Sequence, residues 1–420
     1  MKGILKKATF LLVASIMVVG LFAGCTSVKT TELTVTAPPS TIVTTAPATT
    51  VVTTAPATTV VTTAPPTTIT TTAPPTTVVK TTTAPPTTLA ATINGAGATF
   101  PNPLYSQWFS EYYALTGTKV NYQSVGSGAG ITAITNGTVN FGASDGILTQ
   151  AQLDAAQAAY GTIVTIPMTA GAEAVIYNLA GITTGQLKLT GDVLANIYLG
   201  TITKWNDAAI TALNPTLNLP NAAIATVHRS DSSGTTNIFT NYLDKISTAW
   251  HAGPGTANSV SWPTDAKGTG IGGSGNAGVS GSVQQTPNSI GYVELAYAMQ
   301  NSLPFAQLKN AAGNYTSPSV ASATAAANGV TLPDDTRIMI TNSSDAAAYP
   351  IVGFTWILVY TNQTDQVKGT ALVNMLWWAI HTGQNDCPAL YYAQLSSAAV
   401  VKAEALVKSI KFQGTSLYTG

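Results

Sequence analysis

The stretch Lys119-Val-Asn-Tyr-Gln123-Ser-Val-Gly-Ser127-Gly-Ala-Gly-Ile131-Thr-Ala-Ile134 indicates the architecture of the chain. Its first five residues alternate like a β-strand, a Gly/Ser turn follows, and apolar residues then recur at helical spacing. The same order of strand, turn and helix recurs from residue 92 onward, which indicates an α/β fold. In folds of this class, ligands bind at the carboxyl ends of strands, where helix N-termini converge.

Four short stretches have the chemistry of a small-anion site. Three of them place Thr, Ser or Gly directly before an apolar helical pattern, where free N–H groups and the helix dipole can hold an oxyanion. Arg229 adds one of only two arginines in the chain. Asp145 adds a carboxylate, which is unexpected in an anion site unless the ligand has a proton to donate. The stretches are Ala98–Pro101, Gly126–Gly128, Ser144–Asp145 and Arg229–Thr235.

Each of these residues also has a simpler interpretation. Thr99 suits an ordinary helix N-cap with Pro101 in the first turn, and Ser127 suits a flexible turn between glycines. Arg229 could form a surface ion pair of little value with Asp231. Asp145 could be a capping or turn residue. The residue types alone leave these interpretations open.

The sequence resembles the phosphate-binding proteins of bacterial ABC phosphate importers over nearly all of residues 93 to 415. Ser124 and Ala129 depart from the family pattern in a minor way. The segments that carry the resemblance are Gly95–Pro101, Tyr122–Ser127, Phe141–Asp145, Ile197–Gly200, Lys204-Trp205, Arg229–Thr235, Ser289–Glu294 and the C-terminal third.

This resemblance implies a two-lobed periplasmic-binding-protein fold with two crossing hinge segments. Lobe one is expected at residues 92–170 plus 346–420 and lobe two at 171–345. The implied function is to capture inorganic phosphate and deliver it to the transmembrane subunits of an ABC permease, as a monomer, without enzymatic activity, cofactor or metal. Asp231 is implied as the acidic partner of the arginine. The implied phosphate ligands are Thr99, Phe100, Ser127, Asp145, Arg229, Ser233, Gly234 and Thr235.

Charge is distributed unevenly along the chain. The 17 basic and 17 acidic residues cancel, but five lysines and one glutamate precede residue 91, so the remainder has 12 basic and 16 acidic residues and a net charge of −4. Local dipoles and one arginine must therefore attract an anion, rather than the overall field. The absence of a basic stripe argues against a nucleic-acid partner.

The N-terminus predicts export. Residues 1–24 combine three early lysines with an apolar run, and Ala23-Gly24-Cys25 resembles a lipoprotein cleavage site at which Cys25 receives the lipid. The apolar run is too short for a settled transmembrane helix. Phe22 departs from the usual Leu, and ordinary secretion is the alternative. With Cys25 lipidated, Cys387 has no disulfide partner and is expected to be a packed structural thiol.

Residues 25–91 are predicted to be a disordered, extended tether between the anchor and the globular part. Thr-Thr-Ala-Pro begins at residues 44, 53, 62 and 71, and again at 82. The tract has no aromatic residues, and its prolines oppose helix and ladder hydrogen bonding, so it is expected to be rich in polyproline II.

Two other function classes compete with phosphate capture. One is a binding protein for another oxyanion, namely sulfate, molybdate or tungstate. The other is an exported phosphoryl-transfer or hydrolytic enzyme that uses Ser127 or Ser144. Gly142–Gly146 fits G-x-S-x-G, but Thr149 is expected to cap the next helix, too late for a nucleophile elbow. Gly270–Gly275 fits G-x-G-x-x-G but is expected to lie in a loop without strand-to-helix context. The three histidines have no metal-ligand spacing.

Overall fold

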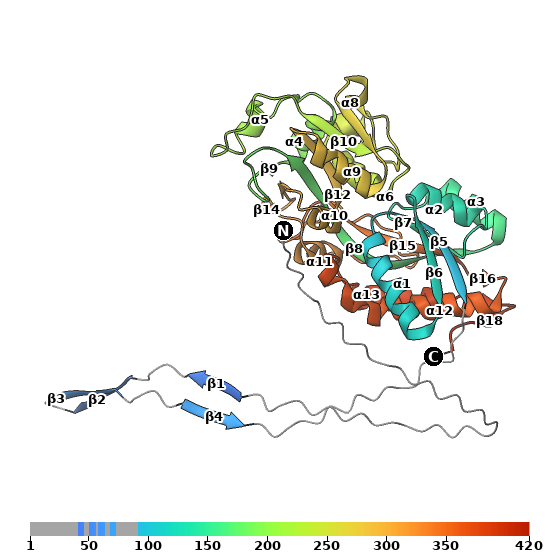
Figure 1. The fold of residues 1–420 in the computed structure, drawn as a ribbon, viewed down its shortest axis with the longest axis horizontal. Helices are drawn as coiled ribbons and strands as arrows, with labels where there is room; N and C mark the ends of the chain where they lie inside the picture. The colour runs from blue at the N-terminus through green and yellow to red at the C-terminus, as the bar shows by residue number, and fades with distance from the viewer. Residues whose placement is uncertain (1–40, 46–49, 56–57, 64–67, 73–90, 420) are drawn as a thin grey trace, which may run out of the picture. The chain divides into compact units, whose positions relative to one another are not determined.

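Two long buried strands, β8 (Ile163–Asn178) and β15 (Val352–Tyr360), lie side by side at the centre of an eight-stranded sheet. This computed structural model describes residues 41–45, 50–55, 58–63, 68–72 and 91–419 (Figure 1). In spatial order the strands of the sheet are β11 (Gly270–Gly273), β10 (Ala225–Arg229), β12 (Ser289–Glu294), β8, β15, β7 (Phe141–Ser144), β5 (Thr92–Gly97) and β6 (Lys119–Ser124).

Strand β8 lies between β12 and β15 and pairs with each of them along a different part of its length. Residues Ile163 to Ala172 pair with β15, whereas Glu173 to Asn178 pair with β12. We call β15, β7, β5 and β6 the first half of the sheet and β12, β10 and β11 the second half. β8 belongs to both. Because the partner changes at Glu173, each half has its own strand ends and its own set of helices.

The helices follow the chain order predicted from the strand–turn–helix pattern. Helices before β8 and after β15 are α1 (Asn102–Thr116), α2 (Ser127–Thr135), α3 (Gln150–Tyr160), α12 (Gln366–Ile380) and α13 (Ser397–Lys408), with the 3₁₀ helices η1 (Thr382–Asp386) and η2 (Pro388–Leu390). Helices between β8 and β15 are α4 (Gly191–Tyr198), α5 (Ala208–Thr211), α6 (Gly234–Ile246), α7 (Thr248–His251), α8 (Pro263–Ala266), α9 (Gly275–Gln285), α10 (Leu295–Gln300) and α11 (Val320–Asn328).

Within residues 91–419, two small sheets lie outside the main one. Each has three short strands and joins segments that are distant in sequence. The first contains β9 (Lys188–Leu189), β13 (Gln307–Lys309) and β14 (Tyr315–Thr316), and the second contains β16 (Asn362–Gln363), β17 (Lys411–Phe412) and β18 (Thr415–Ser416).

Helix α1 illustrates how the sequence specifies an element. The spacing of Leu104, Trp108, Tyr112 and Leu115 predicts one apolar helical stripe, with Gly117 as the stop. Leu104, Trp108 and Tyr112 are buried, and Gly117 ends the helix in the left-handed conformation. Leu115 was predicted on the same buried stripe, which is wrong, because its side chain is 49% exposed in the last turn. The helix therefore buries one face of its first three turns and leaves most of its last turn exposed.

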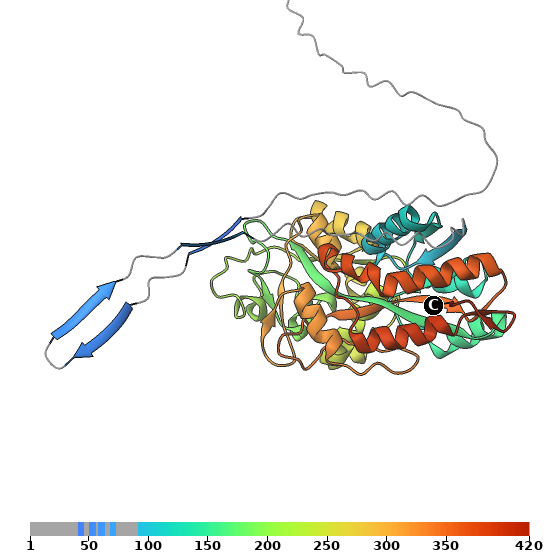
Figure 2. The same ribbon diagram turned by 90° about the horizontal axis from the view of Figure 1, so that it is seen from below.

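The core extends across both halves of the sheet. Helices α12 and α13 lie side by side beneath it (Figure 2). Cys387 is buried near the end of α12 and free of any disulfide, and burial raises the pKa of its thiol to about 12, so the expected structural thiol is confirmed. Within residues that the structure describes, no helix combines the length and apolarity needed to cross a bilayer.

The repeat tract contains four short strands. β1 (Thr41–Thr45) pairs with β4 (Thr68–Thr72) and β2 (Thr50–Ala55) with β3 (Thr58–Thr63), all antiparallel. The expectation of a tether without ladder hydrogen bonds is wrong at these segments, because runs of β-branched Thr, Val and Ile favour strands and the prolines lie outside them. The predicted signal peptide (1–24), Cys25 and the rest of the tract lie outside the described residues.

Candidate anion-binding site

The turn after β5 presents Thr99 and Phe100. Thr99 Oγ1 accepts hydrogen bonds from the backbone N–H of Asn276 (3.2 Å) and from its Nδ2 (2.9 Å). Tyr297 Oη donates to the carbonyl of Thr99 (2.6 Å), and Tyr392 Oη donates to that of Phe100 (2.7 Å). The N-cap of α1 is Pro101, so the interpretation of Thr99 as a simple N-cap is wrong. The turn is held from several directions, with the Thr99 hydroxyl facing α9.

Ser127 lies in the first turn of α2, after Gly126, whose φ of 98° favours glycine. Its Oγ accepts hydrogen bonds from the backbone N–H groups of Asp145 (3.2 Å) and Gly234 (3.0 Å), and lies 3.4 Å from Asp145 Oδ2 as a donor. Ser127 is fully buried. It is therefore not a solvated turn residue, because it joins the two halves of the sheet through one hydroxyl.

Arg229 ends β10 and projects into the same region, with its side chain only 1% exposed. Its Nε donates to Asp231 Oδ1 (2.7 Å), Nη2 donates to Oδ2, and Nη1 donates to Thr235 Oγ1 (3.1 Å). Partial burial raises the pKa of Asp231, but the guanidinium outweighs this effect and lowers it overall. A surface ion pair is thus excluded, and Asp231 orients a buried cation.

The N-terminus of α6 supplies the next residues. Ser233 caps the helix, because its Oγ accepts from the backbone N–H of Thr236 (3.1 Å). Gly234 approaches the opposite half so closely that a Cβ there would lie 2.5 Å from Ser127 Oγ. The N-terminus of α6 therefore faces Ser127 and Asp145, where the helix dipole favours negative charge.

Asp145 follows β7 and is 1% exposed. Burial raises the pKa of its carboxyl to about 7, and Thr355, Arg229 and Ser127 oppose this rise. Its Oδ1 has no hydrogen-bond partner among the described residues. The predicted cap of α3 at Thr149 is confirmed, so the G-x-S-x-G segment does not enter a helix directly. Asp145 is a buried acceptor with one oxygen free for a donor.

Asn276 is a residue of this cluster that the sequence did not identify. Its Nδ2 donates to Thr99 Oγ1 and to Thr235 Oγ1 (3.1 Å), and its Oδ1 accepts from the backbone N–H of Glu294 (2.9 Å). The expectation that Gly270–Gly275 lacks strand-to-helix context is wrong, because β11 passes directly into α9 there. The Gly-rich turn, discounted as a nucleotide motif, was the signal that could have identified Asn276.

Hydrogen bonds thus connect six of the eight predicted residues in two groups of three, one of them joined through Asn276. The first half of the sheet contributes three of these six and the second half contributes the other three. Phe100 contributes a carbonyl fixed by Tyr392, and Ser233 uses its hydroxyl to cap α6. The six are Thr99, Ser127, Asp145, Arg229, Gly234 and Thr235.

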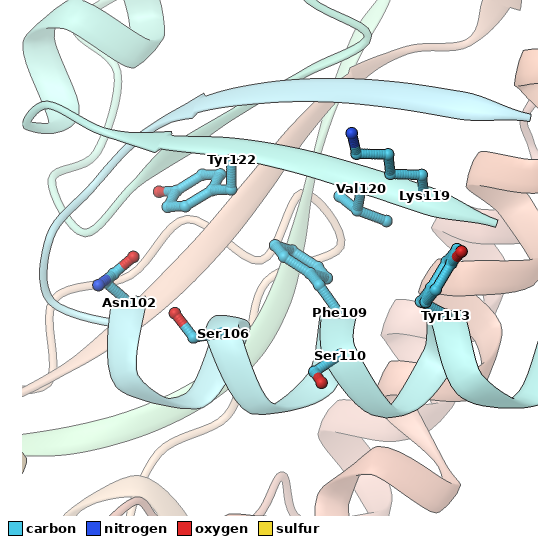
Figure 3. Close-up of a pocket in the computed structure, with 8 residues that line it drawn as sticks. All are labelled: Asn102, Ser106, Phe109, Ser110, Tyr113, Lys119, Val120 and Tyr122. Carbon is cyan, nitrogen blue, oxygen red and sulfur yellow. The ribbon is translucent and has the colours of Figure 1, made fainter. Parts of the chain in front are cut away.

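A separate surface groove of about 570 Å³ lies between α1 and β6 (Figure 3). It contains none of the predicted site residues. Among the described residues, no cluster of three His, Cys, Asp or Glu side chains could hold a metal ion. The groove is lined by Asn102, Ser106, Phe109, Ser110, Tyr113, Lys119, Val120 and Tyr122.

Comparison with known proteins identifies relatives over most of the chain. The model of the PBP superfamily domain matches residues 62–373. The phosphate-binding protein PstS of Xylella fastidiosa (strain 9a5c) is 44% identical over 315 residues, which cover 74% of this chain and 84% of that protein. PstS of Pasteurella multocida (strain Pm70) is 42% identical over 320 residues, covering 76% and 90%.

Solved structures agree on the fold. The periplasmic phosphate-binding protein PfluDING, bound with phosphate, has a TM-score of 0.62 at 23% identity and covers 74% of this chain and 93% of its own. At this level of identity the likeness establishes the periplasmic-binding-protein fold, and the anion-site residues are argued from the geometry above.

Proposed function

The chain belongs to the family of the phosphate-binding protein PstS, and from this premise we propose that it captures inorganic phosphate between the two halves of its sheet. It then delivers the anion to the transmembrane subunits of an ABC permease. The chain is a binding component of a transporter and not an enzyme. The proposed ligands are the eight residues from Thr99 to Thr235 that the sequence predicted, with Asp231 behind Arg229.

The main support for this proposal is that hydrogen-bond donors from both halves of the sheet meet at one buried position. Ser127 and the N-terminus of α2 approach from the first half, and Arg229 and Gly234 approach from the second. In the structure, Gly234 N–H bonds to Ser127 Oγ. An anion between these groups would accept the hydrogen bonds that the protein now makes with itself, at a place where the dipoles of two helices already favour negative charge.

Asp145 supports phosphate over other oxyanions. Near neutral pH phosphate keeps at least one P–OH, whereas sulfate, molybdate and tungstate are fully deprotonated. Asp145 Oδ1 is buried and has no partner among the described residues, so it can accept a hydrogen bond from P–OH. Against a bare oxyanion the same oxygen meets only lone pairs and like charge, which disfavours binding.

We further propose that the halves correspond to two lobes that move about the strands between them, with residues 92–170 plus 346–420 in one lobe and 171–345 in the other. β8 runs through both halves and changes its partner at Glu173, close to the proposed boundary. The second crossing segment lies just before β15. Small changes in these two segments would separate the groups that meet at the anion position.

Binding proteins of this family act outside the cytoplasm. We propose that this chain is exported by residues 1–24, is anchored to the outer face of the cytoplasmic membrane by a lipid on Cys25, and works as a monomer without a cofactor. The tract up to residue 91 would then separate the binding unit from the membrane. This arrangement is supported by the lipoprotein-like Ala23-Gly24-Cys25 motif.

The test is calorimetric titration of ligand-stripped protein with phosphate, sulfate and molybdate. We expect one phosphate per chain, and an increase in unfolding free energy of about 2.7 kcal/mol when phosphate is at 100 times its Kd. Sulfate should compete only at far higher concentration. Protein that shows no heat and no thermal shift with millimolar phosphate would refute the proposal, and tighter binding of sulfate would favour the other-oxyanion alternative.

A further inference from the structure

Two glutamates lie directly opposite each other behind the anion site. Glu173 of β8 pairs in register with Glu294 of β12, so both side chains project from the same face of the sheet. Both residues are completely buried. Neither oxygen of Glu173 has a hydrogen-bond partner among the described residues, nor does Glu294 Oε1. Glu294 Oε2 accepts from the backbone N–H of Ala296 (2.7 Å) and caps α10.

Two carboxylates held this way cannot both stay ionised at low cost. Burial raises the pKa of Glu173 well above its usual value, the negative charges of Asp145 and Glu294 raise it further, and Arg229 opposes these effects. Burial likewise raises the pKa of Glu294, with Asp145 adding to it and hydrogen bonds to the carboxyl opposing it. The other titratable groups that interact electrostatically with the pair are Tyr292, Tyr297, Tyr349 and Tyr392.

The net charge of the cluster around the anion site depends on whether the two glutamates are protonated. Arg229 is the cation of the cluster, and Asp231 already neutralises it. If Asp145, Glu173 and Glu294 were all ionised as well, the cluster would have a net charge of −3, which would repel a phosphate dianion through a low-dielectric interior. Protons on the two glutamates remove most of that repulsion. The site can therefore close on phosphate only with the pair at least partly protonated.

We propose that Glu173 and Glu294 are a proton-holding pair that tunes the charge of the anion site, and that phosphate capture at alkaline pH is accompanied by proton uptake by this pair. The inference rests on the proposed phosphate function and extends it. Both residues act as positioning residues for charge, because they influence the ligand through the field at Arg229 and Asp145.

The experiment measures proton uptake by calorimetry of the full chain with inorganic phosphate at about pH 9, in two buffers of different ionisation enthalpy. There the phosphate is a dianion and remains one, so protons taken up belong to the protein. We expect wild type to take up a measurable fraction of a proton per phosphate. Its Kd should rise by as much as tenfold per pH unit where the free pair loses its proton.

Two variants test whether the proton that is taken up with phosphate binds to this pair. Glu173→Gln and Glu294→Gln imitate the neutral side chains, and the amide oxygen at 294 can still accept from Ala296. Each should retain phosphate binding at neutral pH, take up less than half as much proton as wild type at about pH 9, and have a Kd that changes less with pH. Glu404→Gln on α13 makes the same chemical change far from the site and should match wild type.

The possible outcomes distinguish a failure of the proposed role of the glutamate pair from a failure of the proposed phosphate binding. No phosphate binding by wild type would refute the function itself. Binding without proton uptake at alkaline pH, or uptake undiminished in both variants, would overturn the role of the pair alone. If Glu173→Gln does not fold, Glu294→Gln and the calorimetry of wild type in the two buffers still test whether the pair takes up the proton.

Discussion

Replacing Asp145 with Asn tests whether the buried carboxyl governs both stability and anion choice. The side chain is 1% exposed, and its Oδ1 has no partner among the described residues. An asparagine has nearly the same shape and keeps an oxygen near Ser127, but it cannot ionise. Any difference in pH dependence between the two proteins therefore reports the ionisation of Asp145, together with its effect on the pKa of Glu173 and Glu294.

The expected change in unfolding free energy follows from the pKa of the Asp145 carboxyl. Burial raises it from 3.8 to about 7 in the folded protein. Each pKa unit corresponds to about 1.4 kcal/mol, so the ionised form costs up to about 4 kcal/mol of unfolding free energy. Because the folded pKa is the higher one, the unfavourable contribution grows between about pH 4 and pH 7 and is complete above it. The variant should lack this loss and exceed wild type in stability above pH 7.

Urea unfolding of ligand-stripped protein at several pH values, followed by tryptophan fluorescence, measures the effect. The unfolding free energy of wild type should fall relative to Asp145→Asn as pH rises from about 4 to 7. Asp154→Asn, on the exposed face of α3, is the matched control and should follow wild type. Parallel curves for wild type and Asp145→Asn would refute the argument that desolvation controls this carboxyl.

The same variant tests anion choice. A site built to use a ligand's hydroxyl can reject analogues that lack it by roughly 10⁴–10⁵. Wild type should therefore discriminate strongly against sulfate, and Asp145→Asn should discriminate less, because its NH₂ can turn toward a bare oxygen. Competitive calorimetry with both anions gives the ratio directly. Unchanged discrimination in the variant would remove Asp145 as the selector.

Three further changes probe other parts of the molecule. Arg229→Met should weaken phosphate binding by roughly 2–5 kcal/mol in calorimetry, whereas Arg337→Met, which removes a half-buried arginine paired with Asp335, should not; equal affinities would move the site elsewhere. Gly128→Ala should lower phosphate affinity, because the new Cβ would lie 2.1 Å from Ser232 Oγ and 2.4 Å from its Cβ, so the two halves could not approach as closely; an unaffected Kd would contradict this. Deleting residues 27–90 while keeping Cys25 should leave solution affinity unchanged, and a large loss would mean that the tract contributes to the site.

The sequence was sufficient where local rules decide the structure. The strand–turn–helix order placed Ser127 at the start of α2, Gly117 at the end of α1 and Thr149 at the cap of α3, because backbone geometry and capping depend on neighbouring residues. The resemblance then supplied the longer-range expectation that Arg229 meets Asp145.

Features that depend on tertiary contacts were not predictable. Asn276 joins the cluster only because α9 lies beside the turn at Thr99, and the Gly-rich turn before α9 does not reveal which segment it approaches. The same holds for the opposition of Glu173 and Glu294, which is a matter of strand register across more than a hundred residues. Leu115 was misassigned because periodicity does not reveal where the neighbouring elements end.

The position of β15 has a consequence for the order of assembly in time. It lies between β7 and β8 in the sheet but is synthesised after the whole second set of helices. Until residue 360 has been synthesised, the nascent chain lacks the strand between β7 and β8 and cannot complete its core. Contacts of such long sequence separation form late and slowly. The chain would therefore stay unfolded during most of its synthesis, which is the state that can pass through a translocation channel. In this way the topology itself would favour folding on the far side of the membrane.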